Sequence, residues 1–303
     1  MTDRLREACP ACESRSLSGT ELCDQTFSVC ETCGCVFANP LPEEIWDSDS
    51  SGFYLRDEPT LETAMGEVEK WRVRIREIER FISQGSLLDV GCGLGYVVKA
   101  AEKEGWQAAG CDLSEACCEF GRRVLGVQLF SGGYEELPAL SGIRTPDVIT
   151  LNHVLEHLAT PSEFVRFAEA TLAPGGLAVV EIPNLFSFES LFNAESWYGL
   201  AIPHHVSFFT PESLNRLFGP NFRVKLLEYS VAQFFHDNVA GYLHRLTRDQ
   251  GLIDRYARQF SGTAMVAYIE KQSGLPLEAT PDRNSHSLVR RAVGRIGRVL
   301  RQG

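Results

Sequence analysis

The sequence predicts an α/β fold in which a doubly wound, mostly parallel sheet of seven strands follows a small cysteine-rich module. Three observations lead to this prediction. From residue 86 onward, short apolar runs alternate with amphipathic helical patterns, an order that is typical of a parallel sheet covered by helices on both faces. The first apolar run ends in the glycine-rich turn GCGLG, and two C-x2-C pairs stand in the first 40 residues.

The composition is that of an ordinary globular protein. The chain has 303 residues, of which 44% are hydrophobic and 23% charged, enough for one sizeable core and a small appended module. No apolar run is long enough to cross a membrane, and the opening MTDRLREACPAC has no apolar leader, so we expect a cytoplasmic location. The net charge of −11 disfavours general attraction to nucleic acid, and no nucleic-acid partner is expected.

The two cysteine pairs predict a zinc ribbon in residues 1–40. CPAC contains Cys9 and Cys12, and CETC contains Cys30 and Cys33. Four thiolates with this spacing close a tetrahedral shell around one structural Zn²⁺. So short a segment has too little apolar surface to fold alone, and metal binding would supply its folding free energy. Cys35 is a possible substitute for Cys33, although the C-x2-C spacing favours Cys33. The alternative that these are merely buried cysteines is disfavoured by the spacing.

A helical linker, residues 41–84, is expected next. After the proline-punctuated ANPLPEE, the stretch 61–83 places apolar residues at intervals of three and four, among them Val68, Ile75 and Ile78. Such a stripe predicts an amphipathic helix that packs on the domain behind it.

The main domain is predicted to span residues 85–271. Its helices are expected over 96–105, 114–126 and 161–176, and a further helix should begin at Pro211 with Thr210 as its N-cap. The last strand is expected to be antiparallel. The seven expected strands are 86–90, 108–112, 127–132, 147–152, 177–184, 222–230 and 263–271.

A nucleoside site is predicted where the first strand of this domain ends. Glycines at Gly91, Gly93 and Gly95 let the backbone bend sharply and approach a ligand closely. The dinucleotide pattern G-x-G-x-x-G would need glycine at position 96, where this chain has Tyr96, so the spacing favours adenosylmethionine, which has no pyrophosphate. Asp112 ends the second strand, where a carboxylate accepts hydrogen bonds from ribose hydroxyls.

Over about residues 85–270 the sequence resembles class I S-adenosylmethionine-dependent methyltransferases. LLDVGCGLG is similar to the first motif of that family, GCDLS to its second, and LAPGGLAVVEIPN to its later helix–strand junction. The CPAC…CETC segment followed by VFANPLP resembles the zinc-binding N-terminal module of a bacterial subgroup that includes sugar C-methyltransferases and relatives from polysaccharide and natural-product gene clusters. The resemblance implies a Rossmann-like sheet and S-adenosyl-L-methionine as the cofactor.

The same resemblance implies a set of cofactor-binding residues. The glycine turn and the carboxylate before it would line the methionine end, the residues ending the second strand would bind ribose and adenine, an aromatic residue after the third strand would lie near adenine, and an amide ending the fourth strand would lie beside the sulfonium. These residues are Asp89, Gly91, Gly93, Gly95, Asp112, Leu113, Tyr134 and Asn152.

One group of histidines follows the fourth predicted strand directly. LNHVLEHL contains His153, Glu156 and His157 in the H-x-x-E-H pattern of a zinc-peptidase subgroup. A peptidase would need this motif inside a long helix, but a new helix is expected to begin at Pro161. Three roles therefore stay open: contact with substrate or proton transfer, support of the loop, or binding of a divalent cation, as in the similar E-x-x-E-H of ubiquinone-pathway O-methyltransferases.

A second group of histidines stands in the loop 197–214. A hydroxyl or carbon acceptor needs a base with a pKa near neutral, for which histidine is the usual choice. In the sugar C-methyltransferases such a base lies in a Tyr-His-Glu-His setting. Aligned on V-S-F-F, His205 matches that base, whereas His204 replaces the Glu and Ile202 the Tyr. We predict His205, His204 and His157 as candidate catalytic residues; a structural role for His205 is the alternative.

The C-terminal tail, residues 272–303, is basic in an otherwise acidic chain. Its segment 285–303 contains five arginines and an apolar stripe at helical spacing. A basic amphipathic helix can lie on an anionic membrane surface, so peripheral membrane contact is one expectation and a terminal or dimer-packing helix is the other.

Together these features predict methyl transfer from S-adenosylmethionine to oxygen or carbon of a small molecule, foremost a sugar or sugar nucleotide, otherwise a secondary metabolite. The first alternative is a nucleic-acid or protein methyltransferase that uses the zinc ribbon as a reader. The second is a non-catalytic zinc-ribbon scaffold, which the intact cofactor residues disfavour.

Overall fold

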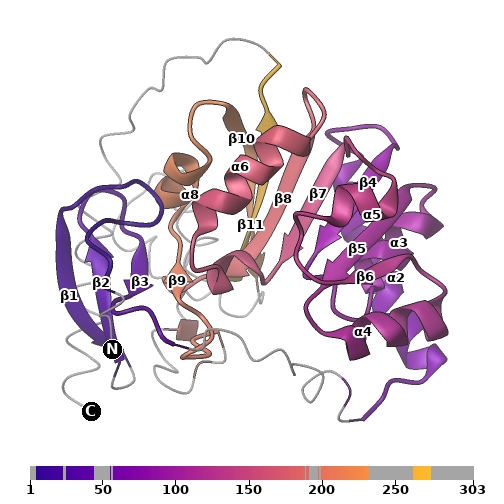
Figure 1. Ribbon diagram of the computed structural model, residues 1–303, viewed down its shortest axis with the longest axis horizontal. Coiled ribbons are helices and arrows are strands. Elements are labelled where there is room, and N and C mark those ends of the chain that lie inside the picture. Colours follow the sequence, from indigo (N-terminus) through magenta and orange to yellow (C-terminus); the bar gives the residue numbers. More distant parts are fainter. Residues whose placement is uncertain are drawn as a thin grey trace, which may run out of the picture.

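A computed structural model describes residues 5–22, 25–43, 55, 57–187, 189–190, 197, 199–231 and 262–273. The basic segment predicted in the C-terminal tail lies outside these residues. The described residues contain two sheets, a large one of seven strands and a small one of four strands (Figure 1).

The large sheet has the predicted doubly wound architecture. Its strand order is β10-β11-β8-β7-β4-β5-β6. The five strands β4 to β8 are parallel where they pair, and β11 is antiparallel to both β8 and β10. The antiparallel last strand is therefore confirmed, and it lies inside the sheet. The strands are β4 Ser86–Val90, β5 Gln107–Asp112, β6 Leu129–Ser131, β7 Val148–Asn152, β8 Leu177–Pro183, β10 Phe222–Val231 and β11 Gly262–Lys271.

Strand β4 lies where the strand order reverses. After β4 the chain continues to β5 and β6 on one side, and then returns to β7 and β8 on the other. In open α/β sheets the carboxyl ends of the strands at such a switch point form the ligand-binding edge. The residues that end β4, β5 and β7 therefore share this edge.

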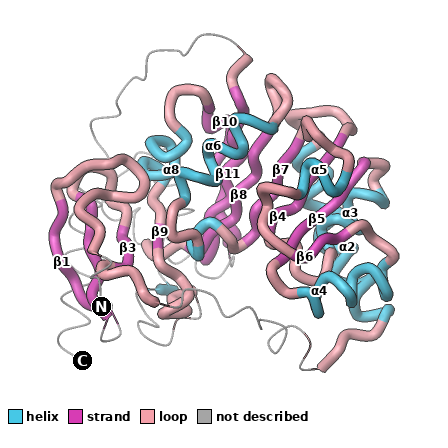
Figure 2. The backbone as a smooth tube through the Cα atoms, viewed as in Figure 1, coloured by secondary structure: helices cyan, strands magenta, loops and turns pink. Residues whose placement is uncertain are grey.

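Helices cover both faces of the large sheet. Because side chains alternate along a strand, Leu87 of β4 packs in one apolar cluster and Leu88 in another. The cluster around Leu87 includes residues of α2, α3 and α4, and the cluster around Leu88 includes residues of α5, α6 and α8 (Figures 1 and 2). These helices are α2 Leu61–Ile78, α3 Tyr96–Lys103, α4 Glu115–Phe120, α5 Leu137–Ser141, α6 Pro161–Thr171 and α8 Pro211–Phe218.

The helix predicted over 114–126 begins as α4 and changes its geometry at Gly121, where residues Gly121–Leu125 form a π-helical turn. A Cβ at Gly121 would lie 2.3 Å from Leu129 Cδ1 and 2.8 Å from the carbonyl oxygen of Leu94. The helix therefore approaches β6 and the glycine turn too closely for any side chain at this position.

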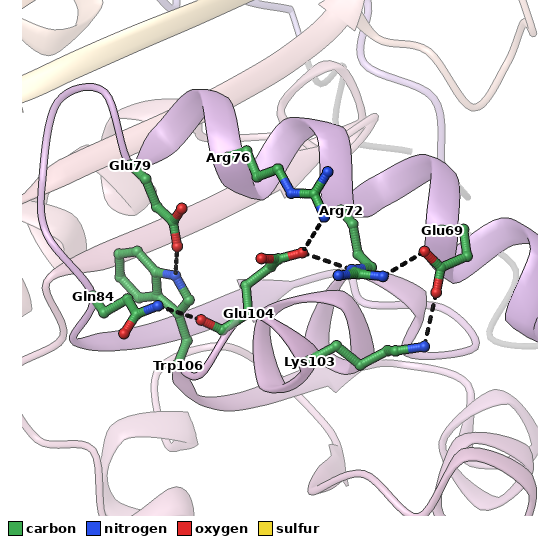
Figure 3. Close-up of polar contacts among 8 residues, drawn as sticks. All are labelled: Glu69, Arg72, Arg76, Glu79, Gln84, Lys103, Glu104 and Trp106. Atoms are coloured by element: carbon green, nitrogen blue, oxygen red, sulfur yellow. Dashed lines mark hydrogen bonds and ion pairs between the residues drawn. The ribbon is translucent and has the colours of Figure 1, made fainter.

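Helix α2 packs against α3 through ion pairs as well as through its apolar stripe. Its residues Val68, Ile75 and Ile78 are fully buried. The carboxylate of Glu104 accepts hydrogen bonds from Arg72 Nε at 2.6 Å and pairs with Arg76 Nη2 at 3.0 Å (Figure 3). Helix α2 thus forms part of the layer that covers the sheet.

The small sheet joins the cysteine-rich segment to the main domain. Its order is β1-β2-β3-β9, all antiparallel. Three of its strands come from the N-terminal segment, but β9 follows the loop that carries His205 (Figure 2). Phe27 and Phe208 pack with ring centroids 6.2 Å apart in the core of this unit. The strands are β1 Leu17–Leu22, β2 Gln25–Cys30, β3 Val36–Ala38 and β9 Ser207–Phe208. Among the described residues, no helix has the length and apolarity needed to cross a membrane.

Candidate functional site

A buried carboxylate stands at the carboxyl end of β4. Asp89 is 1% exposed; its Oδ1 accepts hydrogen bonds from Thr150 Oγ1 at 2.6 Å and Asn152 Nδ2 at 3.4 Å, both on β7. Burial raises the pKa of Asp89 to about 7, against the lowering effect of the Thr150 hydroxyl. A positive charge beside Asp89 would favour its ionised form. The methionine end of adenosylmethionine would provide such a charge.

The glycine turn after β4 requires glycine for two different reasons. Gly91 has φ +68°, and a Cβ there would lie 2.3 Å from Val154 Cγ2. Gly93 has φ +50°, but a Cβ there would meet nothing within 4 Å. The turn is therefore packed against the loop after β7 at Gly91 and open at Gly93, where its backbone is accessible to a ligand.

Asp112, at the end of β5, lies against this turn. Its two carboxylate oxygens accept backbone N–H bonds of 2.9 Å from Gly93 and Ser114. Each oxygen retains a second acceptor position, which suits ribose hydroxyls. Next to it Leu113 is 54% exposed, an apolar surface on which an adenine ring could pack. Asp112 and the turn thus form a fitting cradle for a nucleoside.

Tyr134 lies beyond β6 and packs on α6. Its ring centroid is 5.6 Å from that of Phe164 and 4.9 Å from that of Phe167. The ring is only half-buried, and its segment follows β6, the strand that pairs with β5.

The H-x-x-E-H segment forms a turn that differs from a peptidase helix. His153 has φ 55°, a left-handed backbone conformation, and Leu155–His157 form a short 3₁₀ turn. Glu156 is 1% exposed, and its Oε1 lies 3.2 Å from Nδ1 of His153. Because His153 lies outside the helical turn, the two histidines of this segment do not present one helix face.

The loop before β9 brings His205 to this turn. The rings of His157 and His205 meet edge to face, with centroids 4.6 Å apart. His205 Nε2 lies 4.0 Å from Glu156 Oε1. Glu156, His157 and His205 each offer a ligand atom, and these atoms lie within 4.8 Å of one another. Two segments nearly 50 residues apart in sequence therefore build one polar cluster, which we call the His–Glu cluster.

Both histidines of the cluster have a defined tautomer. His157 Nδ1 lies 3.0 Å from the carbonyl oxygen of His204, and His205 Nδ1 lies 2.7 Å from that of Gly199. A carbonyl only accepts, so each Nδ1 carries the proton and each Nε2 has the lone pair in the neutral ring. Burial lowers the pKa of His157 to about 4 and lowers that of His205 as well. Both rings are therefore neutral at pH 7.

The other charged neighbours respond differently. Burial disfavours the charged forms of both His153 and Glu156, but their mutual hydrogen bond and charge raise the pKa of His153 and lower that of Glu156. Glu156 is therefore ionised at neutral pH. The side chain of His204 is exposed, and its carbonyl holds His157. The backbone of His204 is thus part of the hydrogen bonding that holds the cluster.

The four predicted zinc ligands come together as their spacing implies. Sγ of Cys9 lies 3.6 Å from Sγ of Cys33, and Sγ of Cys12 lies 3.5 Å from Sγ of Cys30. The four sulfur atoms lie within 4.8 Å of one another. In a tetrahedral Zn–S₄ site with bonds of about 2.3 Å, sulfur atoms are about 3.8 Å apart. The arrangement therefore fits one zinc ion.

The cysteine cluster is joined to the His–Glu cluster through β9. Ala38 donates its N–H to the carbonyl of Val206, which follows His205, at 2.9 Å. Val206 in turn donates to the carbonyl of Glu156 at 2.9 Å. Backbone hydrogen bonds thus run from β3 to the residue after His205, and from there to the 3₁₀ turn.

Glu156 is a functional candidate that the sequence predicts only as part of the H-x-x-E-H motif and not as a buried carboxylate. A charged residue between Leu155 and Leu158, both apolar, was the signal that a buried carboxylate stands there.

Comparison with known proteins agrees with these features. Residues 63–221, more than half of the chain, match the family described as "Methyltransferase domain". Ubiquinone biosynthesis O-methyltransferase of Caulobacter sp. (strain K31) is 33% identical over 32% of this chain and 40% of its own length. The protein of the same name from Coxiella burnetii (strain Dugway 5J108-111) is 31% identical over 34% of this chain and 47% of its own length. The chain thus spans less than half of each of these relatives.

A solved structure of a SAM-dependent methyltransferase from Archaeoglobus fulgidus shares the fold. It superimposes with a TM-score of 0.52 at 22% identity, covering 68% of this chain and 94% of that one. With the strand order, the glycine turn after β4 and the carboxylate that ends β5, these matches establish that the chain belongs to the methyltransferase-domain family and has its class I, Rossmann-like fold.

Proposed function

We propose that the protein transfers a methyl group from S-adenosylmethionine to an oxygen or carbon atom of a small molecule. The observation that carries this proposal is the cradle at the switch point, in which Asp112 is fixed by Gly93 and Ser114 beside the open backbone of the turn. Its position and chemistry suit the ribose of the cofactor.

The cofactor supplies a methyl group already activated on a sulfonium. The protein then has to hold the acceptor in line with that methyl group. Asn152, which ends β7 and contacts Asp89, is proposed to lie beside the sulfonium, between the cofactor and the acceptor. The acceptor atom forms the new bond to the methyl carbon as the carbon–sulfur bond breaks.

His205 and His157 are proposed to activate the acceptor. Their Nε2 atoms carry lone pairs at neutral pH, because Nδ1 of each ring donates to a backbone carbonyl. Such an atom takes up the proton that a hydroxyl or carbon acid loses on methylation. The ionised Glu156 beside them stabilises an imidazolium once it forms.

The acceptor is proposed to be a sugar, a sugar nucleotide or a secondary metabolite. In support, the cysteine-rich head and the V-S-F-F loop resemble those of sugar C-methyltransferases, and the curated relatives are named for O-methylation in ubiquinone biosynthesis. We further propose that Cys9, Cys12, Cys30 and Cys33 hold a structural zinc ion, which maintains the sheet that positions β9.

Two measurements test the proposal. Calorimetric titration of the full chain with S-adenosylmethionine should show one binding site, and failure to bind would exclude the enzyme function. A screen of sugar nucleotides and phenolic metabolites with radiolabelled cofactor should then yield a methylated product. Turnover only on a protein or nucleic-acid substrate would overturn the small-molecule assignment while leaving the cofactor assignment intact.

A further inference from the structure

We propose that the His–Glu cluster of Glu156, His157 and His205 is a binding site for one divalent transition-metal ion, separate from the cysteine cluster. The proposal deepens the acceptor side of the proposed function and rests on it only for the role of the ion.

The first argument is the donor set. One carboxylate and two imidazoles are the ligands found together in mononuclear sites for zinc and iron. Their ligand atoms lie within 4.8 Å of one another. In a site with bonds of about 2.1 Å, neighbouring ligand atoms are about 3 to 3.4 Å apart. Small side-chain rotations therefore suffice to bring all three onto one ion.

The second argument is the direction of the lone pairs. Backbone carbonyls fix Nδ1 of both rings as donors, the arrangement by which proteins orient a histidine for metal binding through Nε2. His205 Nε2, with its lone pair, then faces Glu156 Oε1 at 4.0 Å. In this tautomer both atoms are acceptors, and a metal cation between them would serve both.

The third argument is the state of Glu156. The residue is 1% exposed, and its Oε2 has no hydrogen-bond partner among the described residues. Leaving a buried carboxylate oxygen without a partner is costly. Its other oxygen accepts from His153 at 3.2 Å, which supports the carboxylate in the way that outer hydrogen bonds support metal ligands. His153, whose ring is 44% exposed, thus positions Glu156 from outside the site.

The donor set also indicates the kind of ion. Two imidazoles favour zinc, cobalt or ferrous iron over magnesium or calcium, which prefer oxygen ligands. Three protein ligands leave room on the ion for an oxygen atom of the acceptor. Coordination lowers the pKa of such an oxygen, so a bound ion would let a hydroxyl acceptor release its proton to solvent and react at the methyl carbon. The ion-bound protein would therefore activate the acceptor through the ion, and Nε2 of the two histidines would act as the base only in the ion-free protein.

The test uses the full chain with its cysteine cluster loaded with zinc. Titration with Co²⁺ should show one further equivalent with visible d–d bands and without the near-ultraviolet absorption of a cobalt–thiolate bond. The variants Glu156→Gln and His205→Ala should each weaken this binding at least tenfold, whereas Glu163→Gln, which alters an exposed carboxylate in the first turn of α6, should leave it unchanged. Equimolar Mg²⁺ should not compete. No cobalt beyond the cysteine cluster, or binding indifferent to Glu156 and His205, would overturn the proposal.

A second measurement on the unaltered protein guards against variants that fail to fold. With ¹⁵N-labelled histidine, one equivalent of Zn²⁺ beyond the cysteine cluster should shift the Nε2 resonances of two rings and leave their Nδ1–H tautomer in place. Absence of such shifts would count against the site. Neither experiment uses the cofactor, so calorimetry with S-adenosylmethionine reports separately on the proposed function.

Discussion

The hydroxyl of Thr210 donates a 2.7 Å hydrogen bond to the carbonyl oxygen of Cys33. The same hydroxyl accepts the N–H of Ser213 at 3.0 Å and so caps α8. One buried side chain therefore binds the last residue of the cysteine cluster to a helix that covers the methyltransferase sheet.

Replacing that hydroxyl should destabilise both units at once. Thr210→Val removes a helix cap and leaves the buried carbonyl of Cys33 without its donor, and we expect a loss of about 1–2 kcal/mol in the free energy of unfolding. Thr210→Ser retains the hydroxyl and should lose much less. Urea unfolding of the zinc-loaded protein measures the difference. Equal stabilities for the two variants would show that the bond contributes nothing.

Loss of the zinc ion should disturb the segment that follows His205 more than it disturbs the cofactor site. In the double variant Cys9→Ser/Cys12→Ser the protein should lose one bound zinc. Because β3 then loses its support, amide exchange of Val206 and Phe208 should become faster. Affinity for S-adenosylmethionine should stay within about twofold, since Asp112 and the glycine turn lie on the other sheet. Zinc analysis, hydrogen exchange and calorimetry check the three parts, and a zinc content equal to wild type would refute the ribbon.

The carboxylate of Asp112 should dominate cofactor affinity. Hydrogen bonds to a charged group contribute about 1.5–3 kcal/mol, so Asp112→Ala should weaken binding of S-adenosylmethionine roughly 10- to 100-fold. Glu115→Gln, at the exposed start of the adjacent helix α4, serves as the matched control and should bind normally. Calorimetry on both variants decides; wild-type affinity in Asp112→Ala would place the nucleoside elsewhere.

Asp89 should make stability depend on pH. Its pKa is raised from 3.8 to about 7, mainly by burial. The folded state therefore holds a proton that the unfolded state releases between these values, and the free energy of unfolding should fall as pH rises from about 4 to about 7. Above pH 7 this contribution levels off.

Asp89→Asn isolates that contribution, because the amide is neutral at every pH. The difference in unfolding free energy between wild type and Asp89→Asn should therefore change across the same window. Thermal or urea unfolding between pH 4 and 8 measures it. A difference that is constant with pH would show that Asp89 has an ordinary pKa.

Gly91 should couple the glycine turn to the loop that carries the His–Glu cluster. A Cβ at this position would lie 2.3 Å from Val154 Cγ2, and φ is +68°. Gly91→Ala should therefore destabilise the fold by more than 1 kcal/mol. Adding Val154→Ala relieves the clash but leaves the backbone strain, so the double variant should recover part of the loss. If it recovers none relative to the sum of the single variants, the contact with Val154 is unimportant.

Local sequence patterns were sufficient for most of the fold. The apolar run Ser86–Val90 with its glycine turn, the carboxylate ending the next strand, and the cap at Thr210 each depend on neighbouring residues only. The cysteine cluster could be predicted for a similar reason, since each C-x2-C pair is a local feature and a four-coordinate zinc site needs two such pairs.

The acceptor side was less predictable because it depends on contacts between distant segments. Strand β9 has only two residues, Ser207 and Phe208, and no sequence period marks so short a strand. The H-x-x-E-H spacing implies a helix, yet the left-handed backbone of His153 breaks it and turns Glu156 inward toward His205. The approach of Glu156 to His205 therefore depends on tertiary contacts and not on local sequence.

The pairing of β3 with β9 also bears on how the chain is made. Val36 and Phe37 pair with Phe208 and Ser207, so the small sheet lacks its fourth strand until the ribosome has synthesised all five parallel strands of the large sheet. Contacts between such distant segments form late in folding because the intervening chain has to be ordered first. The cysteine-rich segment is therefore a poor candidate for exchange between homologues as an independent module. In a chimaeric protein, its β3 would have to pair with the β9 of the other homologue.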